Sequence, residues 1–261
     1  MANKKTITKP DTITKSQQNA LITPVTWGLV IISQLVVGFW LAWQLLAQFS
    51  FAYPAAYELL AIDAHIERFA PANRFRPDFE TTDRAQHLRL FAEIAESIGN
   101  SGKGLAEITY TTSAGETHTL LRTAEVIHLQ DVANLVNFFY GVSGVSLVVL
   151  LLGLLAALKL QLRFPSAKAI AMGIVAVIAA VLLPLLLIGP KAVFYWLHVQ
   201  IFPPDHEWFF YYQESLMTTL MKAPDVFGFI GLLLGVSGLL FWIVQIVTVR
   251  CFIKRLSADQ N

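Results

Sequence analysis

The sequence of 261 residues is poor in charged side chains and almost devoid of cysteine. Only 14% of the residues are charged, and four long segments contain no charge at all: residues 16–57, 132–158, 169–190 and 226–249. A helix of about 20 apolar residues crosses the roughly 30 Å hydrocarbon core of a bilayer. These absences exclude an ordinary soluble domain. They predict an all-α membrane protein with four transmembrane helices.

Several reactive motifs are also missing. Cys251 is the only cysteine, so no disulfide can form within the chain. The sequence contains no Gly-x-Ser-x-Gly, no His-Glu-x-x-His and no glycine-rich phosphate loop. The net charge of +1 gives no indication of nucleic-acid binding. If the protein is an enzyme, its reaction should need neither ATP nor a covalent intermediate on serine or cysteine.

The uncharged segments divide the chain into spans and connections. We predict a cytoplasmic tail (1–24), a first span that remains as an uncleaved anchor (25–50), an extracytoplasmic cap (51–122), a helix that continues into the second span (123–158), a cytoplasmic loop (159–168), a third span (169–190), an extracytoplasmic aromatic loop (191–225), a fourth span (226–249) and a cytoplasmic tail (250–261).

The orientation follows from the distribution of basic residues. The two tails and the 159–168 loop carry ten basic residues and two acidic ones: Lys4, Lys5, Lys9, Lys15, Lys159, Arg163, Lys168, Arg250, Lys254 and Arg255, against Asp11 and Asp259. Basic flanks remain on the cytoplasmic side of a membrane. Both termini are therefore expected in the cytoplasm, and the cap and the aromatic loop outside it.

The cap has the pattern of a small α+β unit. Apolar residues near helical spacing predict a helix over 54–69, and Thr82 is placed to cap a second helix that ends near Gly99. Segments 106–111 and 118–121 flank a Ser-Ala-Gly-Glu turn and predict a short hairpin. At about 70 residues the cap is too small for a large core of its own.

All six histidines lie on the predicted outer side: His65, His87, His118, His128, His198 and His206. Thr123 is expected to begin the helix that carries His128, with Glu125 and Asp131 three residues away on either side. That spacing places both carboxylates on or near the face of His128. Either could accept the proton of one ring nitrogen and orient the imidazole.

His198 lies in the second outer segment, where nine of the residues from Phe194 to Tyr212 are aromatic. An aromatic belt explains most of these side chains, but it does not need histidine. An ionisable residue at the membrane boundary indicates function. His128 and His198 would each lie at the outer end of a different span, where two imidazoles could act as general acid and general base. His206 follows two prolines, and we expect it on an exposed turn.

A metal site is the alternative use of these side chains. His128, Asp131, His198, Asp205 and His206 are of types that bind zinc. The sequence has no His-x-x-x-His spacing, however, so ligands would have to converge from two loops. We predict no metal and no other cofactor.

Two short patterns resemble the integral membrane family of lipoprotein intramolecular transacylases (Lit). They are Glu125-Val-Ile-His128-Leu-Gln-Asp131-Val132 and Phe194-x-x-x-His198-x-x-x-Phe202, followed by Trp208 and the stretch 216–227. The four-span layout and the large first outer loop are similar as well. The stretch from Gln213 to Asp225 departs from the family pattern, in which an acidic residue and a Phe-Pro pair often follow the tryptophan.

The resemblance implies a reaction in the bacterial cytoplasmic membrane. The family moves the sn-2 acyl chain of a diacylglyceryl lipoprotein to the amine of its N-terminal cysteine, and the product is a lyso-form lipoprotein. His128 and His198 correspond to the essential pair, with the choice of acid and base left open. A diacylated lipoprotein and membrane lipid are the expected partners, nucleic acid is not, and the sequence does not define the oligomeric state.

Further contacts and one different function are also considered. Tyr195, Trp208, Tyr211 and Arg122 are candidates for oxyanion or substrate contacts. The alternative function is a non-catalytic membrane factor whose cap binds a partner or senses pH through the scattered histidines. The distance between His128 and His198 distinguishes the two: rings within about 7 Å at the mouth of a lipid-sized groove favour the enzyme, and rings on different sides of the bundle favour the binding factor.

Overall fold

The structure, a computed structural model, describes residues 15–258. The outermost parts of both predicted tails, including Lys4, Lys5, Lys9, Asp11 and Asp259, lie outside these residues. Four helices are long and apolar enough to cross a membrane: α1 (Lys15–Gln48), α5 (Thr123–Lys159), α6 (Ala167–Ile188) and α9 (Asp225–Ala258). The predicted all-α class, with a small sheet between the first two spans, is confirmed.

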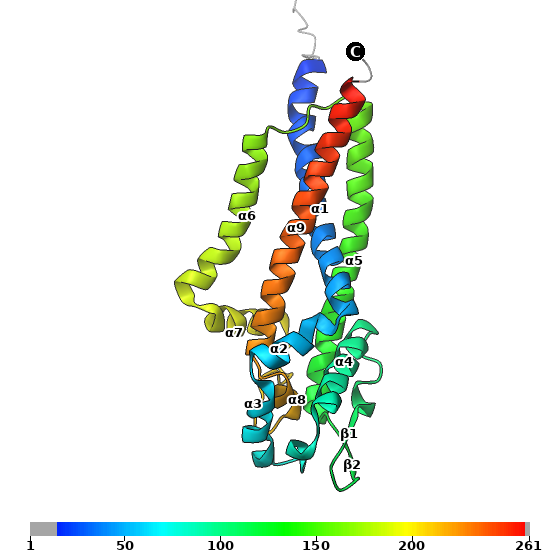
Figure 1. The fold of residues 1–261 in the computed structure, drawn as a ribbon. Coiled ribbons are helices and arrows are strands. Elements are labelled where there is room, and N and C mark those ends of the chain that lie inside the picture. Colours follow the sequence, from blue (N-terminus) through cyan, green and yellow to red (C-terminus); the bar gives the residue numbers. More distant parts are fainter. Residues whose placement is uncertain (1–14, 259–261) are drawn as a thin grey trace, which may run out of the picture.

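Helix α1 packs along both α5 and α9, and these three helices form the bundle in Figure 1. Close approach of α1 to α9 depends on small residues. A Cβ atom on Gly38 would lie 3.1 Å from the backbone nitrogen of Trp242, and one on Gly238 would lie 2.9 Å from the ring of Phe39. In a membrane, where the surroundings are also apolar, such close backbone packing is a main source of helix association.

Helix α6 stands apart from the bundle and leads directly into α7 (Pro190–Ile201). No residue of α6 is buried. Gly189 has a φ of 85°, which turns the chain, and Pro190 then begins the new helix, a position where its missing N–H costs nothing. His198 therefore lies on a separate helix rather than on an extension of the third span.

The cap consists of short helices and one hairpin. Its α-helices are α2 (Tyr53–Leu59), α3 (Ile62–Phe69) and α4 (Arg84–Gly99), its 3₁₀ helices are Ser50–Ala52, Ala70–Ala72, Phe79–Thr81 and Leu105–Glu107, and its strands are β1 (Thr109–Thr111) and β2 (Thr117–Thr119). The strands pair antiparallel, with Tyr110 opposite His118. The hairpin is shorter than predicted.

Two local predictions in the cap were wrong. The helix expected over 54–69 is interrupted at Ala61, which has a left-handed φ of 48°. The second helix is capped by Asp83, whose carboxylate accepts the backbone N–H of Gln86 at 2.8 Å, whereas the hydroxyl of Thr82 bonds to the carbonyl of Phe79. Aspartate caps helices at least as well as threonine, so the cap forms one residue later.

The cap shares its hydrophobic core with the second outer loop. Buried residues from α2 to β2 pack with Phe210, with α8 (Leu216–Leu220) and with Val226 at the start of α9. The hydroxyl of Tyr53 donates to the carbonyl of Leu220 at 2.6 Å, and the ammonium of Lys222 donates to the carbonyl of Leu60. The two outer segments therefore form one folded unit against the outer end of α5.

Candidate active site

His128 and His198 meet at the junction of α5 and α7. Their ring centroids are 6.2 Å apart, with an angle of 31° between the ring planes. This distance lies within the limit of about 7 Å expected of the enzyme, while the expected lipid-sized groove is not one of the two hollows described below. The two residues come from segments 70 positions apart, so the fold, rather than local sequence, brings the imidazoles together.

The proton on His198 can be assigned from its contacts. Its Nδ1 lies 2.8 Å from the carbonyl oxygen of Phe194, one helical turn earlier. A carbonyl only accepts hydrogen bonds, so Nδ1 carries the hydrogen and Nε2 of the neutral ring has a free lone pair. Burial lowers the pKa of His198, and the bond to Phe194 opposes that shift. The result is an imidazole that is neutral at physiological pH and has one basic nitrogen available.

His128 lies in a more enclosed position, 8% exposed, among aromatic rings. Phe202 meets it edge-on at 4.9 Å between centroids, and Phe210 lies at 6.2 Å. Its Nδ1 is buried and has no hydrogen-bond partner among the described residues. A buried polar atom without a partner costs free energy and is uncommon in folded proteins, so this nitrogen is available to a substrate.

Aromatic side chains enclose the pair from the α7 side. Phe194 and Phe202, four residues before and after His198, lie 3.9 and 5.2 Å from its ring, and Trp208 lies at 4.8 Å. The spacing of the motif quoted above places these phenylalanines next to His198 on one helix face. Phe202 also packs on His128, a contact that was not predicted although Phe202 was part of the motif.

Asp131 does not make the contact expected of it. Its Oδ2 lies 2.6 Å from Nδ1 of His206, not on His128. His206 is therefore half-buried rather than free on an exposed turn, and its hydrogen bond to Asp131 raises its pKa. The hydrogen bond between His206 and Asp131 joins the loop after α7 to the first turns of α5. Asp131 lies about one helical turn after His128.

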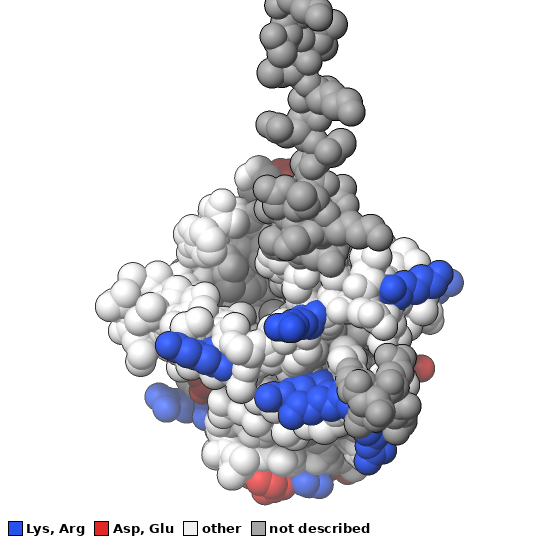
Figure 2. All heavy atoms as spheres, turned by 90° about the horizontal axis from the view of Figure 1, so that it is seen from above, with Lys and Arg blue, Asp and Glu red and all other residues white. Residues whose placement is uncertain are grey.

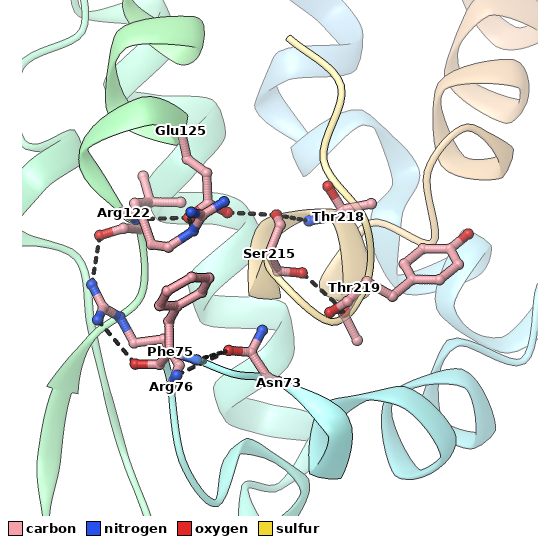
Figure 3. A network of polar contacts seen from close by, with 10 residues as sticks. Asn73, Phe75, Arg76, Arg122, Glu125, Ser215, Thr218 and Thr219 are labelled. Atoms are coloured by element: carbon pink, nitrogen blue, oxygen red, sulfur yellow. Dashed lines mark hydrogen bonds and ion pairs between the residues drawn. The ribbon is translucent and has the colours of Figure 1, made fainter. Parts of the chain in front are cut away.

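Glu125 also differs from the expectation. It is fully buried, and its carboxylate accepts from the Ser215 hydroxyl and, at 2.7 Å, from the backbone N–H of Arg122. Ser215 in turn accepts the backbone N–H of Thr218 at 2.9 Å and so caps α8. Figure 3 shows this chain of contacts between the start of α5 and α8. Because the bond to Arg122 fixes the start of α5, the N-cap is Arg122 rather than Thr123.

Among the candidates for substrate contacts, Arg122 lies behind the ring of Phe210. Its guanidinium lies over the rings of Phe75 and Phe210, at 4.7 and 5.7 Å, and its Nε is 3.5 Å from Glu125. Nε and Nη2 are buried without hydrogen-bond partners in the described part of the chain. Phe210 separates this cation from His128.

The other three candidates divide into two groups. Trp208 packs directly on His198, and Tyr195 packs on Trp208 with a centroid distance of 5.5 Å. Tyr211 is 61% exposed, and its ring contacts Phe209. The structure therefore brings Trp208 and Tyr195 to the histidine pair and places Tyr211 away from it.

The remaining cap histidines have structural surroundings. The hydroxyl of Thr82 donates its one hydrogen to the carbonyl of Phe79, so it accepts from Nε2–H of His87, and the other ring nitrogen accepts from Tyr57. Burial lowers the pKa of His87 and of His65 to about 4. His118 lies beside Glu116. Two of the residues proposed as pH sensors therefore stay neutral throughout the physiological range.

The described residues contain no metal cluster, and the two hollows described here lie away from the histidine pair. Within residues 15–258, no three His, Cys, Asp or Glu side chains are grouped so that they could hold an ion. One hollow of about 340 Å³ lies beside α4, and another of about 280 Å³ lies between α1 and α5. The pair itself is enclosed by the aromatic rings described above.

Comparison with known proteins agrees with the resemblance. Residues 104–223 match the family model of the lipoprotein intramolecular transacylase Lit. This range includes His128, His198, Asp131, Glu125 and Ser215. No curated protein matches the sequence.

Three solved structures share the fold. The membrane integral lipoprotein intramolecular transacylase Lit from Bacillus cereus superposes with a TM-score of 0.60 at 16% identity, covering 94% of this chain and 99% of the other. Two variants of the Bacillus cereus protein, with one histidine replaced by arginine or alanine, give TM-scores of 0.59 and 0.58 at 15% identity. Both matches cover 94% of this chain; they cover 95% of the arginine variant and 96% of the alanine variant.

The sequence match covers the α5–α8 region that carries both histidines, and the shared fold extends over nearly the whole chain. Residues 104–223 therefore match the Lit family of lipoprotein intramolecular transacylases, which are acyltransferases, and the chain as a whole has the fold of a Lit structure.

Proposed function

We propose that the protein moves the sn-2 acyl chain of a diacylglyceryl lipoprotein to the amine of the lipoprotein's N-terminal cysteine, with His128 and His198 as the catalytic pair. The observation that carries this proposal is the 6.2 Å separation of two imidazoles delivered by α5 and α7, inside the segment that matches the family. The expected partner is a diacylated lipoprotein.

The chemistry needs proton transfer and no cofactor. The amine nitrogen attacks the ester carbonyl carbon, a C–N bond forms, and the C–O bond to glycerol breaks. One proton leaves the amine and one proton reaches the glycerol oxygen, so no water is consumed and no electrons are exchanged. A positioned acid or base contributes roughly 10²–10⁴ in rate to such a reaction.

The contacts of the two rings support a division of labour. Nε2 of His198 has a free lone pair because Nδ1 is hydrogen-bonded to Phe194, so His198 takes the proton of the attacking amine. The imidazolium of His198 then returns this proton to the leaving glycerol oxygen. The ring of His128, buried among aromatic side chains, stays neutral and can hydrogen-bond the reacting groups through Nδ1, which has no partner in the described part of the chain. Aromatic side chains around both rings exclude water, so the amine rather than a water molecule attacks the ester.

Two further features lower the barrier. The amine and the ester belong to one molecule, and in well-oriented intramolecular reactions the effective molarity reaches about 10⁵–10⁸ M. The oxyanion that forms on the carbonyl needs a donor. Trp208 and Tyr195, which lie at the histidine pair and carry an N–H and an O–H, are better placed to be that donor than Arg122, which Phe210 separates from His128. Asp131 acts on the site through His206, by holding the loop that carries Trp208 and Phe210.

We further propose that the protein lies in the bacterial cytoplasmic membrane with both termini in the cytoplasm. Figure 2 shows lysine and arginine side chains around the end of the molecule where the long helices terminate. The α5–α6 connection and the end of α9 contribute Lys159, Arg163, Lys168, Arg250, Lys254 and Arg255. Basic residues near span ends remain cytoplasmic, which supports an extracytoplasmic histidine pair.

The test is a reporter lipoprotein expressed in a strain that lacks its usual N-acylating enzyme. Mass spectrometry of the N-terminal peptide measures lyso-form product. We expect His128→Ala and His198→Ala each to reduce product by about 10²–10⁴. His118→Ala, which removes a cap histidine remote from the pair, is the matched control and should retain activity. Unchanged product from either variant of the pair, at equal protein levels in the membrane, contradicts the two-histidine mechanism.

A further inference from the structure

A second hollow lies between α1 and α5, away from the histidine pair. Its volume is about 280 Å³, and it is lined by Trp40 and Gln44 of α1 and by Tyr140, Ser143, Gly144 and Leu147 of α5. Tyr140 lies 12 residues after His128, which is about 18 Å further along α5 at 1.5 Å per residue. The hollow is therefore separate from the candidate active site.

The depth of the hollow corresponds to the outer edge of the membrane. Gln44 lies four residues, or about 6 Å, before the end of α1, where the chain enters the cap. Trp40, Trp43 and Tyr140 are of the types that gather at the boundary between headgroups and hydrocarbon. The ester groups of glycerolipids lie at this boundary, and their acyl chains extend inward from it.

Two polar side chains of the hollow, Tyr140 and Gln44, have donor hydrogens without an acceptor among the described residues. The hydroxyl of Tyr140 accepts from the indole N–H of Trp43 at 3.2 Å, so its own hydrogen remains available. The amide of the half-buried Gln44 has no hydrogen-bond partner among the described residues. Ser143 is satisfied by the carbonyl of Phe139. Polar side chains at membrane depth are costly, and they indicate a function when no protein group pairs with them.

The shape of the hollow depends on Gly144. A Cβ atom on this glycine would meet nothing within 4 Å, so the space beside it is open. Most of the lining is apolar, which suits a hydrocarbon chain. The volume is slightly below the range of about 300–1,000 Å³ that holds a whole drug-sized ligand, so it accommodates part of one lipid chain rather than an entire lipid.

We propose that this hollow binds one acyl chain of a membrane glycerophospholipid, with the Gln44 amide and the Tyr140 hydroxyl donating to the ester carbonyl of that chain. The ester is an acceptor without donors of its own, which matches two unpaired donors. The site is built where α1 meets α5, one of the two main contacts of α1 in the bundle. It does not depend on the proposed acyl transfer.

Photolabelling tests this proposal on the full protein. The protein is placed in nanodiscs of phosphatidylethanolamine and phosphatidylglycerol that contain a trace of phosphatidylcholine with a diazirine on one acyl chain. After irradiation, mass spectrometry locates the labelled peptides. We expect label concentrated on 40–44 and 140–147, with far less on α6, which has no buried residue but lines no such hollow.

Two substitutions on α5 provide a matched pair. Gly144→Phe fills the hollow and should reduce labelling of 140–147 at least tenfold. Gly141→Phe adds the same side chain at a glycine that also has open space but does not line the hollow, and it should leave labelling unchanged. Gln44→Leu should reduce labelling about three- to tenfold, the effect of one lost hydrogen bond.

Three outcomes would overturn the assignment. Label spread evenly over all lipid-exposed helices indicates ordinary annular lipid. Equal labelling of the Gly144→Phe and Gly141→Phe proteins shows that the hollow does not hold the chain. Displacement of the label by a diacylated lipopeptide, but not by an equal amount of unlabelled phosphatidylethanolamine, reassigns the hollow to the lipoprotein.

Discussion

The bond between Ser215 and Glu125 joins residues 90 positions apart and should stabilise the whole outer unit. Ser215→Ala removes the hydroxyl that donates to a fully buried carboxylate, and it also removes the cap on the N–H of Thr218. Leaving a buried acceptor unsatisfied costs about 1–3 kcal/mol, and loss of a helix cap costs about 0.5–2 kcal/mol. Because one side chain serves both contacts, we expect a total loss of about 2–4 kcal/mol.

The assay is thermal unfolding of the purified protein in detergent, followed by tryptophan fluorescence. Ser113→Ala, in the exposed hairpin turn, is the matched control and should change stability by less than about 0.5 kcal/mol. A double-mutant cycle with Glu125→Ala isolates the direct bond. We expect a coupling free energy of at least about 1 kcal/mol.

Unfolding of Ser215→Ala at the same temperature as Ser113→Ala, or a cycle without coupling, would refute a stabilising role for this bond. Either result would mean that the carboxylate of Glu125 is satisfied equally well without Ser215. A loss of stability without coupling would assign the effect to the helix cap alone.

Three other predictions concern the stability contribution of His87, the contact between His206 and Asp131, and the effect of chelation. Burial lowers the pKa of His87 from an ordinary 6.5 to about 4 in the folded protein. Between about pH 4 and 6.5 the unfolded chain therefore binds more protons than the folded one. The free energy of unfolding is highest above about pH 6.5 and decreases as the pH falls toward 4. We expect a loss of about 1–3 kcal/mol across this window, and His87→Gln should flatten the measured pH dependence of the unfolding temperature. His206→Ala and Asp131→Asn should each reduce lyso-form product by a similar factor, and the double variant should be no worse than either single one, because both changes remove the same contact; additive losses would contradict a shared role. EDTA should leave product formation unchanged, since residues 15–258 contain no group of three metal-binding side chains; activity that is lost on chelation and restored by zinc would instead indicate a metal enzyme.

The features that could be predicted from the sequence are those that depend on composition over long windows. Uncharged runs predicted the four spans because the cost of charge in a bilayer dominates every local preference. The proximity of His128 and His198 was predictable because each lies at the outer end of a different long apolar segment. The aromatic residues around His198 predicted a belt at the membrane boundary, and two members of that belt, Phe194 and Trp208, pack on its imidazole.

The contacts that could not be predicted either join distant segments or depend on which of two neighbouring residues begins a helix. Asp131 is three residues from His128, but it bonds to His206, 75 residues away. Helical spacing restricts which side chains share a face; it does not decide which partner another loop brings to that face. Thr82 and Thr123 were expected to cap helices, yet adjacent residues occupy those positions, because several polar side chains compete at each helix start.

The shared core of the cap also has a consequence for biosynthesis. The apolar side chains of residues 53–121 complete their burial against Phe210, α8 and the first turn of α9. During synthesis, more than 80 further residues must emerge before these partners exist. In the proposed topology, the first outer segment should therefore cross the membrane early and stay exposed to proteases until synthesis of the fourth span is nearly complete.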